Sequence, residues 1–174
     1  MRLVLPLVLL ALLTACTAQA RGAPPPPVGG GGTPPALIGA WRASVQVSSG
    51  AFAAAKGMEF MYVFHIDRTL TESSNYDAAP PVPPAYGMWR MIEGAGNVFE
   101  AKYEFFSTTV SLPDHFTAGA GRVPSGRGVF TERITVAPDG RTFSSIIRHE
   151  LFDTQGRRID GGGEAVGRGV RMGF

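Results

Sequence analysis

The segment WRASVQVS, residues 41–48, alternates apolar and polar side chains without a break. The apolar face of this extended segment carries Trp41, Ala43, Val45 and Val47, and the polar face carries Arg42, Ser44, Gln46 and Ser48. Successive side chains of a β-strand point to opposite faces, so the pattern predicts a strand with one face in a core and the other in solvent.

The same alternation recurs in seven further segments of the chain. They cover 58–66, 69–76, 86–92, 98–107, 128–137, 142–152 and a last segment within 157–171. The Gly, Asp, Asn and Pro residues between them are typical of hairpin turns. We therefore expect an all-β domain of eight antiparallel strands in sequence order. Closing these strands into an up-and-down barrel would remove the long exposed edges of an open sheet.

The lengths of the connections predict that the two ends of this barrel differ. The longer connections follow the first, third and fifth strands and contain SGAFAAAK, DAAPPVPPA and TTVSLPDHFTAGAGRVPSGR. The connections after the second, fourth and sixth strands are tight. Since alternate connections lie at the same end of an up-and-down barrel, we expect one closed end and one open mouth.

The chain before the first strand has the composition of a signal followed by a linker. An uncharged run from Leu3 to Leu13 follows Arg2. This run is shorter than the roughly 20 residues of a membrane-spanning helix but fits a secretory signal. Residues 17–36, TAQARGAPPPPVGGGGTPPA, are typical of a linker. The expected divisions are a signal peptide over 1–15, a linker over 16–36 that begins at Cys16, and a barrel domain over 37–174.

Cys16 is the only cysteine of the chain and ends the motif Leu13-Thr14-Ala15-Cys16. This motif resembles the lipobox of bacterial lipoproteins. The resemblance implies that the Cys16 thiol carries a diacylglycerol, that the signal is cut before it, and that acyl chains such as palmitate anchor the protein. Thr17 after the cysteine resembles the class exported to the outer membrane. We therefore expect a lipid-anchored envelope protein at the periplasmic or surface face of that membrane.

An alternative cleavage site stays open. Ala18-Gln19-Ala20 fits an A-x-A motif, whose use would release a secreted protein beginning at Arg21.

The charge balance excludes one class of partner. The chain has 16 Lys and Arg residues against 14 Asp and Glu, and one of the basic residues, Arg2, lies in the signal. The basic residues form no block, whereas nucleic-acid binding needs clustered Lys and Arg. We expect no nucleic-acid partner, and the sequence specifies no oligomeric state.

A family resemblance follows from the motif Gly39-x-Trp41 at the start of the first strand. This motif, at this position before eight strands, resembles the lipocalins and the wider calycin group of ligand-binding barrels. The segments FHIDRTLTESS, YGMWR and FEAKYEFF also resemble small secreted bacterial lipocalin-like proteins. The resemblance implies that Trp41 closes the base of the barrel against an arginine near the last strand, either Arg168 or Arg171. The chain leaves no room for the helix that typical lipocalins carry before the last strand, so the shorter, helix-free calycins fit better.

Motifs of known chemistry are missing from the sequence. It contains no G-x-S-x-G, H-E-x-x-H, Walker or dinucleotide-binding motif. His65, His115 and His149 are not spaced as metal ligands. We expect no cofactor and no metal. The glycine-rich tract DGGGEAVGRG is interpreted as a slim last strand that permits close packing where the barrel closes.

Polar residues on apolar strand faces are the best candidates for a functional site. Glu132 shares its face with Phe130 and Ile134, and His149 shares its face with Ile147. Because their strands are hairpin neighbours, we expect the two side chains to come near each other inside the barrel. The candidate ligand-binding residues are Tyr62, Tyr103, Phe105, Glu132 and His149, of which Glu132 and His149 are also candidate catalytic groups. Two alternatives stay open: a purely structural hydrogen-bond network, and an opposite register that leaves Glu132 and His149 in solvent. Trp41 and Trp89 are expected in the barrel floor rather than at a ligand.

Three functions remain from these observations. The first is a membrane-tethered barrel that binds a small hydrophobic or amphipathic ligand. The second, implied by the resemblance, is a cyclase or isomerase of the allene oxide cyclase type, and the third is a structural or interaction lipoprotein without a ligand. The sequence favours a binding protein over an enzyme.

Overall fold

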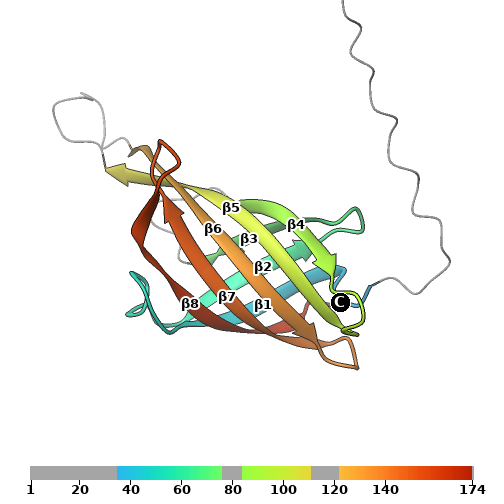
Figure 1. Cartoon of the computed structure of the whole chain (residues 1–174). Coiled ribbons are helices and arrows are strands. Elements are labelled where there is room, and N and C mark those ends of the chain that lie inside the picture. The colour runs from blue at the N-terminus through green and yellow to red at the C-terminus, as the bar shows by residue number, and fades with distance from the viewer. Residues whose placement is uncertain (1–34, 76–83, 111–121, 174) are drawn as a thin grey trace, which may run out of the picture. The chain divides into compact units, whose positions relative to one another are not determined.

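The computed structural model describes residues 35–75, 84–110 and 122–173, which form a closed antiparallel β-barrel (Figure 1). Each strand pairs with its sequence neighbours, and the first pairs with the eighth to close the ring. The strands are β1 (Gly39–Val47), β2 (Met58–Phe64), β3 (Thr69–Ser74), β4 (Ala85–Met91), β5 (Val98–Val110), β6 (Arg122–Val136), β7 (Thr142–Phe152) and β8 (Arg158–Arg171). These ranges contain no α-helix. The prediction of an eight-stranded, all-β up-and-down barrel is confirmed.

In the parts of the chain that the structure describes, no helix has both the length and the apolar character needed to cross a membrane.

Two strands are longer than the alternation predicts. β5 continues to Val110, and β6 begins at Arg122 rather than at Gly128. The added part of β6 contains Pro124 and Gly126, which interrupt the pattern, and the pairing of β5 with β6 shifts register between Ser107 and Thr108. The connection predicted to cover residues 108–127 is therefore mostly strand at its two ends. Its middle, 111–121, and most of the DAAPPVPPA connection lie outside the described residues.

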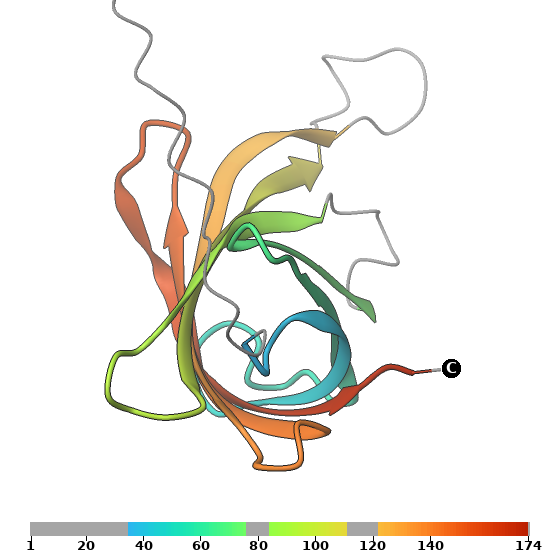
Figure 2. The same ribbon diagram turned by 90° about the vertical axis from the view of Figure 1, so that its right-hand side faces the viewer.

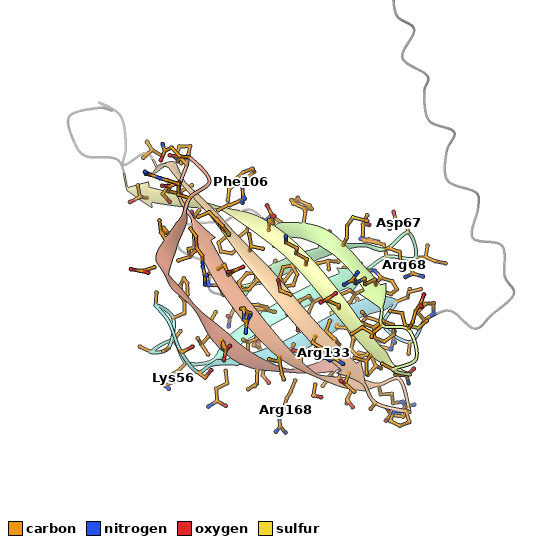
Figure 3. The ribbon with its side chains drawn as sticks, in the orientation of Figure 1. Lys56, Asp67, Arg68, Phe106, Arg133 and Arg168 are labelled. Carbon is orange, nitrogen blue, oxygen red and sulfur yellow. The ribbon has the colours of Figure 1, made fainter. Side chains whose placement is uncertain are left out.

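Side chains along each strand alternate between the core and the outer wall of the barrel, as the sequence predicts. The buried core contains apolar residues from all eight strands, among them Trp41, Phe60, Tyr62, Leu70, Trp89, Phe99, Tyr103, Ile134, Phe143, Ile147 and Ala165. Residues of the opposite parity, such as Arg133 and Arg168, project from the outer wall (Figure 3). On β7 the register leaves Ile146 exposed and buries Ile147. The choice that the sequence left open for β7 is thus settled, with His149 facing inward.

One end of the barrel is closed around Trp41. The segment before β1 lies across this end (Figure 2), and its Leu37 carbonyl accepts a hydrogen bond of 2.8 Å from the Trp41 indole. The Arg171 guanidinium lies 4.3 Å from the centre of the Trp41 ring. It also donates to the carbonyl oxygens of Ile38 at 2.6 Å, of Gly140 at 2.7 Å, and of Ala36. Arg171, not Arg168, is therefore the arginine that packs on Trp41.

The glycine-rich tract forms β8, where the barrel closes. Its inward positions include Gly167 and Gly169, which pair with Ser145 and Phe143 of β7. A Cβ on Gly169 would lie 2.1 Å from the Phe143 ring, and one on Gly167 would lie 2.3 Å from the Ser145 hydroxyl. The last strand therefore has to be slim because the larger β7 side chains occupy the space in front of it.

Candidate functional site

A buried polar trio lies inside the barrel. Glu132 of β6, Tyr62 of β2 and Tyr103 of β5 are each almost fully buried. Both phenols donate to Glu132 Oε2, at 3.1 Å from Tyr62 and 2.8 Å from Tyr103, and the two hydroxyl oxygens are 3.4 Å apart. The trio results from the alternation of three strands, since each residue sits at an inward position among apolar neighbours.

Burial determines the protonation of this trio. Loss of solvation raises the pKa of Glu132, and hydrogen bonds from Ser145, Tyr103 and Tyr62 offset part of that rise. Burial, followed by the nearby Glu132 charge, raises the pKa of both tyrosines well above 10. The phenols therefore stay protonated and act as donors. Glu132 Oε1 and Ser145 Oγ have no hydrogen-bond partner of normal geometry, although Ser145 is near enough to lower the Glu132 pKa.

A stack of rings extends from the trio toward the mouth. The Phe130 ring lies 5.0 Å from Tyr103 and 4.6 Å from His149, at interplanar angles of 29° and 21°. Phe105 stacks beside both, with its centroid 5.4 Å from Phe130 and 5.8 Å from His149. Gly128 provides the space for this arrangement, because a Cβ there would lie 2.3 Å from Phe105 and 2.8 Å from His149 Nε2.

His149 is the polar member of the stack. Its side chain belongs to a residue that is 8% exposed, and Nε2 is buried without a hydrogen-bond partner. Burial lowers the pKa of the imidazole, so the ring is neutral at neutral pH. A neutral imidazole offers one donor and one acceptor nitrogen. A buried polar atom without a partner is costly unless a ligand or water supplies the missing hydrogen bond.

The stack borders a cavity of about 270 Å³ at the end of the barrel where the longer connections lie. Its described walls come from the ends of the strands and from the connection after β1. They are formed by Val45, Val47, Ser49, Phe52, Met58, Phe60, Glu72, Ser74, Ala85, Phe105, Ser107, Thr108, Phe130, Ile147, His149, Gly161, Gly163, Glu164 and Ala165. The volume is slightly below the range of about 300–1,000 Å³ typical of pockets for drug-sized ligands. The cavity thus suits a small, largely apolar molecule.

The structure divides the five predicted ligand-binding residues into two groups. Phe105 and His149 line the cavity, whereas Tyr62, Tyr103 and Glu132 are not part of its lining. Glu132 and His149 both face the interior, but in the β6–β7 register Phe130 is opposite His149 and Glu132 is opposite Ile147. No hydrogen bond joins Glu132 to His149. A ligand in the cavity reaches His149, while the carboxyl of Glu132 lies outside the lining.

Several residues of the cavity were not predicted. Glu72 on β3 is the most informative, because it is an acidic residue that is buried and lines the cavity. It shares the inward face of Leu70, so the parity argument that identified Glu132 would also have identified Glu72. Phe52 could not have been predicted to line the cavity, because it lies in the connection after β1, where no alternating pattern indicates which side chains face inward.

The remaining candidates lie elsewhere. His65 is exposed in the turn between β2 and β3, at the other end of the barrel. Cys16 and His115 lie outside the described residues. Within the ranges that are described, no three His, Cys, Asp or Glu side chains are grouped so that they could hold a metal ion.

No protein-family model, curated protein sequence or solved structure matches this chain.

Proposed function

We propose that this protein is a lipocalin-like binding barrel that holds a small hydrophobic or amphipathic molecule in the cavity at its mouth. The observation that carries the proposal is the cavity itself. Its walls are mostly apolar and aromatic, and the buried His149 Nε2 beside it lacks a hydrogen-bond partner. Binding sites of this kind combine an apolar surface with a few polar groups that orient the ligand.

Binding is better supported than catalysis. Glu132 and the two tyrosines, whose pKa values are raised by burial, do not line the cavity and are hydrogen-bonded to one another. An acid or base must come within hydrogen-bond reach of the atom it serves. Of the two predicted catalytic candidates, Glu132 and His149, His149 alone lines the cavity. The purely structural alternative is less well supported, because a cavity that side chains do not fill lowers the stability of a fold.

The lipid anchor is a separate part of the proposal. It rests on the motif that ends at Cys16, and it attaches the barrel to the cell envelope, at the outer membrane if Thr17 acts as a sorting signal. Replacing Cys16 with Ser should move the protein from the membrane fraction to the soluble fraction. An unchanged distribution would refute the anchor and leave the binding proposal intact.

Binding is tested by filling the cavity. Ala165 lines the cavity and is buried, while the next residue, Val166, faces solvent on the outside of β8. Fluorescence titration of the full chain with the neutral dye N-phenyl-1-naphthylamine, and with a panel of small aromatic competitors, reports occupancy. The proposal expects saturable binding that Ala165→Phe abolishes and Val166→Phe leaves unchanged. No binding of dye or competitors, or equal binding by both variants, would refute it.

A further inference from the structure

We infer, on the basis of the binding function above, that the cavity prefers flat aromatic molecules to saturated molecules of the same size. The residue that determines this preference is Phe105, whose ring stacks on the ring of the ligand. The inference rests on the orientation of the rings in the cavity wall, on the side of the barrel that carries them, and on the cavity volume.

The rings that border the cavity share one orientation. The plane of Phe130 is tilted by 27° from that of Phe105 and by 21° from that of His149, and Phe105 is tilted by 27° from His149. All three residues line the cavity, and the two phenylalanines are only partly buried although they face the interior. A flat ligand ring can therefore align with all three rings at once, in the offset stacking that aromatic pairs favour.

Aromatic and aliphatic residues lie on different sides of the cavity. Phe105, Phe130 and His149 belong to β5, β6 and β7, whereas Val45 and Val47 belong to β1. In the closed ring of eight strands, β1 lies opposite β5. A ligand between them meets methyl groups on one side and rings on the other. Methyl groups contact a saturated ring as well as a flat one, so the aromatic side makes the distinction.

Packing holds the Phe105 ring in place before a ligand binds. Phe105 is paired with Gly128 across β5 and β6, and its ring lies 2.3 Å from where a Cβ on Gly128 would be. Phe130 and His149 also contact the ring, with centroids 5.4 and 5.8 Å away. A side chain that is already ordered loses little entropy on binding, so its stacking on the ligand contributes to affinity.

The cavity volume limits the size of the ligand. An apolar cavity of about 150 Å³ holds benzene, so a cavity of about 270 Å³ accommodates an aromatic ring with a short substituent. A saturated ring of the same size also enters this volume. Size alone therefore does not separate the two classes, and any difference in affinity reports the contact with the aromatic side.

Two neutral alcohols of nearly equal size, benzyl alcohol and cyclohexylmethanol, test the preference. Neither carries a charge, so the comparison does not depend on the protonation of the acidic residues at the cavity. NMR titration of the full chain should give a Kd for benzyl alcohol about threefold to tenfold below that of cyclohexylmethanol, because an aromatic pair gains affinity beyond its buried area. The saturated ring is the more apolar of the two, so hydrophobic burial alone predicts the opposite order.

Variants assign this preference to one residue. Phe105→Leu should raise the Kd of benzyl alcohol to that of cyclohexylmethanol or above it, and continued binding of cyclohexylmethanol shows that the variant is folded. Phe106→Leu is the matched control, because it makes the same change at the next residue, which is 72% exposed on the outer wall (Figure 3). This control should behave as wild type.

A measurement on the wild-type protein tests the stacking itself. Protons that lie over the face of an aromatic ring are shielded by its ring current, so the ring protons of benzyl alcohol should move upfield as the cavity saturates. Bound protons without an upfield shift would overturn the stacked geometry.

The outcomes separate the two proposals. Equal or tighter binding of cyclohexylmethanol by the wild-type protein would overturn the aromatic preference and leave the binding function standing. A preference that survives Phe105→Leu, or that Phe106→Leu removes equally, would overturn the assigned role of Phe105. Failure of both alcohols to bind would count against the binding function itself.

Discussion

Glu132 shows how one interior position combines packing with an unfavourable charge. It is fully buried, and two phenols donate to a single oxygen of its carboxyl group. These hydrogen bonds offset only part of the loss of solvation, because the pKa remains raised. For a raised carboxyl pKa the folded state binds its proton more tightly than the unfolded state does, so stability falls as pH rises through the range between the two pKa values.

Glu132→Gln tests this effect directly. The amide keeps an oxygen for the tyrosines and cannot ionise, so the variant should lack the stability loss that begins above the ordinary pKa of 4.5. The free energy of unfolding of the variant, relative to wild type, should increase as pH rises from 4 to 8, as measured by urea denaturation at each pH. A difference that stays constant with pH would show that Glu132 titrates normally. Glu100→Gln, on the outer face of β5, serves as the control.

Part of this site could be predicted from the sequence. Strand parity assigned Glu132 and His149 to the interior, and the same rule applied to β3 would have added Glu72. Their separation could not be predicted, because it depends on the pairing of β6 with β7, which places Phe130 rather than Glu132 opposite His149. The unpaired Nε2 of His149 also depends on the packing of Phe105 over Gly128, which no local pattern encodes.

At the scale of the element, β4 shows why a short motif is ambiguous. Gly87-Met88-Trp89 repeats the G-x-W pattern of Gly39 and Trp41, but its glycine has a different role. Gly87 pairs with Tyr103, and a Cβ on Gly87 would lie 2.1 Å from the Lys102 carbonyl oxygen and 2.5 Å from the Tyr103 Cα. The glycine allows β4 to approach β5 closely and thereby positions Tyr103 for Glu132.

Gly87→Ala should therefore destabilise the barrel by about 1–3 kcal/mol, as expected when an added methyl group forces the backbone of a packed strand to move. Met88→Ala is the matched control, since Met88 is exposed on the same strand and should change stability by less than about 0.5 kcal/mol. Urea denaturation of both variants measures the difference. Equal stability of the two variants would mean that β4 and β5 separate at little cost.

Strand prediction succeeded where alternation is regular and failed where it is interrupted. The segment 142–152 matches β7 in full, because its inward and outward residues alternate from Phe143 to His149. The start of β6 was missed, because Pro124 and Gly126 are residues typical of loops, yet both pair with β5, and Gly126 also lies against Phe152 of β7. Pairing with long neighbouring strands there outweighs the local preference.

On the scale of the whole barrel, the two ends have different constructions. At one end Arg171 connects the segment before β1, the turn between β6 and β7 and the Trp41 ring. At the other end the aromatic stack leaves a cavity. The barrel can leave one end open because strand pairing continues around the whole ring and an apolar core lies between the closed end and the cavity.

Arg171→Gln tests the role of the closed end. Loss of the charged hydrogen bonds to three backbone carbonyls should lower the free energy of unfolding by roughly 2–3 kcal/mol. Hydrogen exchange should become faster first at the amides of Ile38 and Met172, which bond near this end. Arg168→Gln, on the outer wall, should be within about 0.5 kcal/mol of wild type. Equal losses in the two variants would contradict the assignment of Arg171 as the residue that closes the barrel.

The central claim is that the cavity at the mouth binds a small hydrophobic or amphipathic molecule, and NMR mapping of the binding site tests it most directly. During titration of the full chain with N-phenyl-1-naphthylamine, the account predicts that the ring signals of Phe105, Phe130 and His149 shift together along one saturable curve. It also predicts a change in the His149 Nε2 nitrogen shift, with little change at Trp41 or Trp89. Shifts confined to the outer wall or to the closed end, or no saturable shift at all, would contradict the claim.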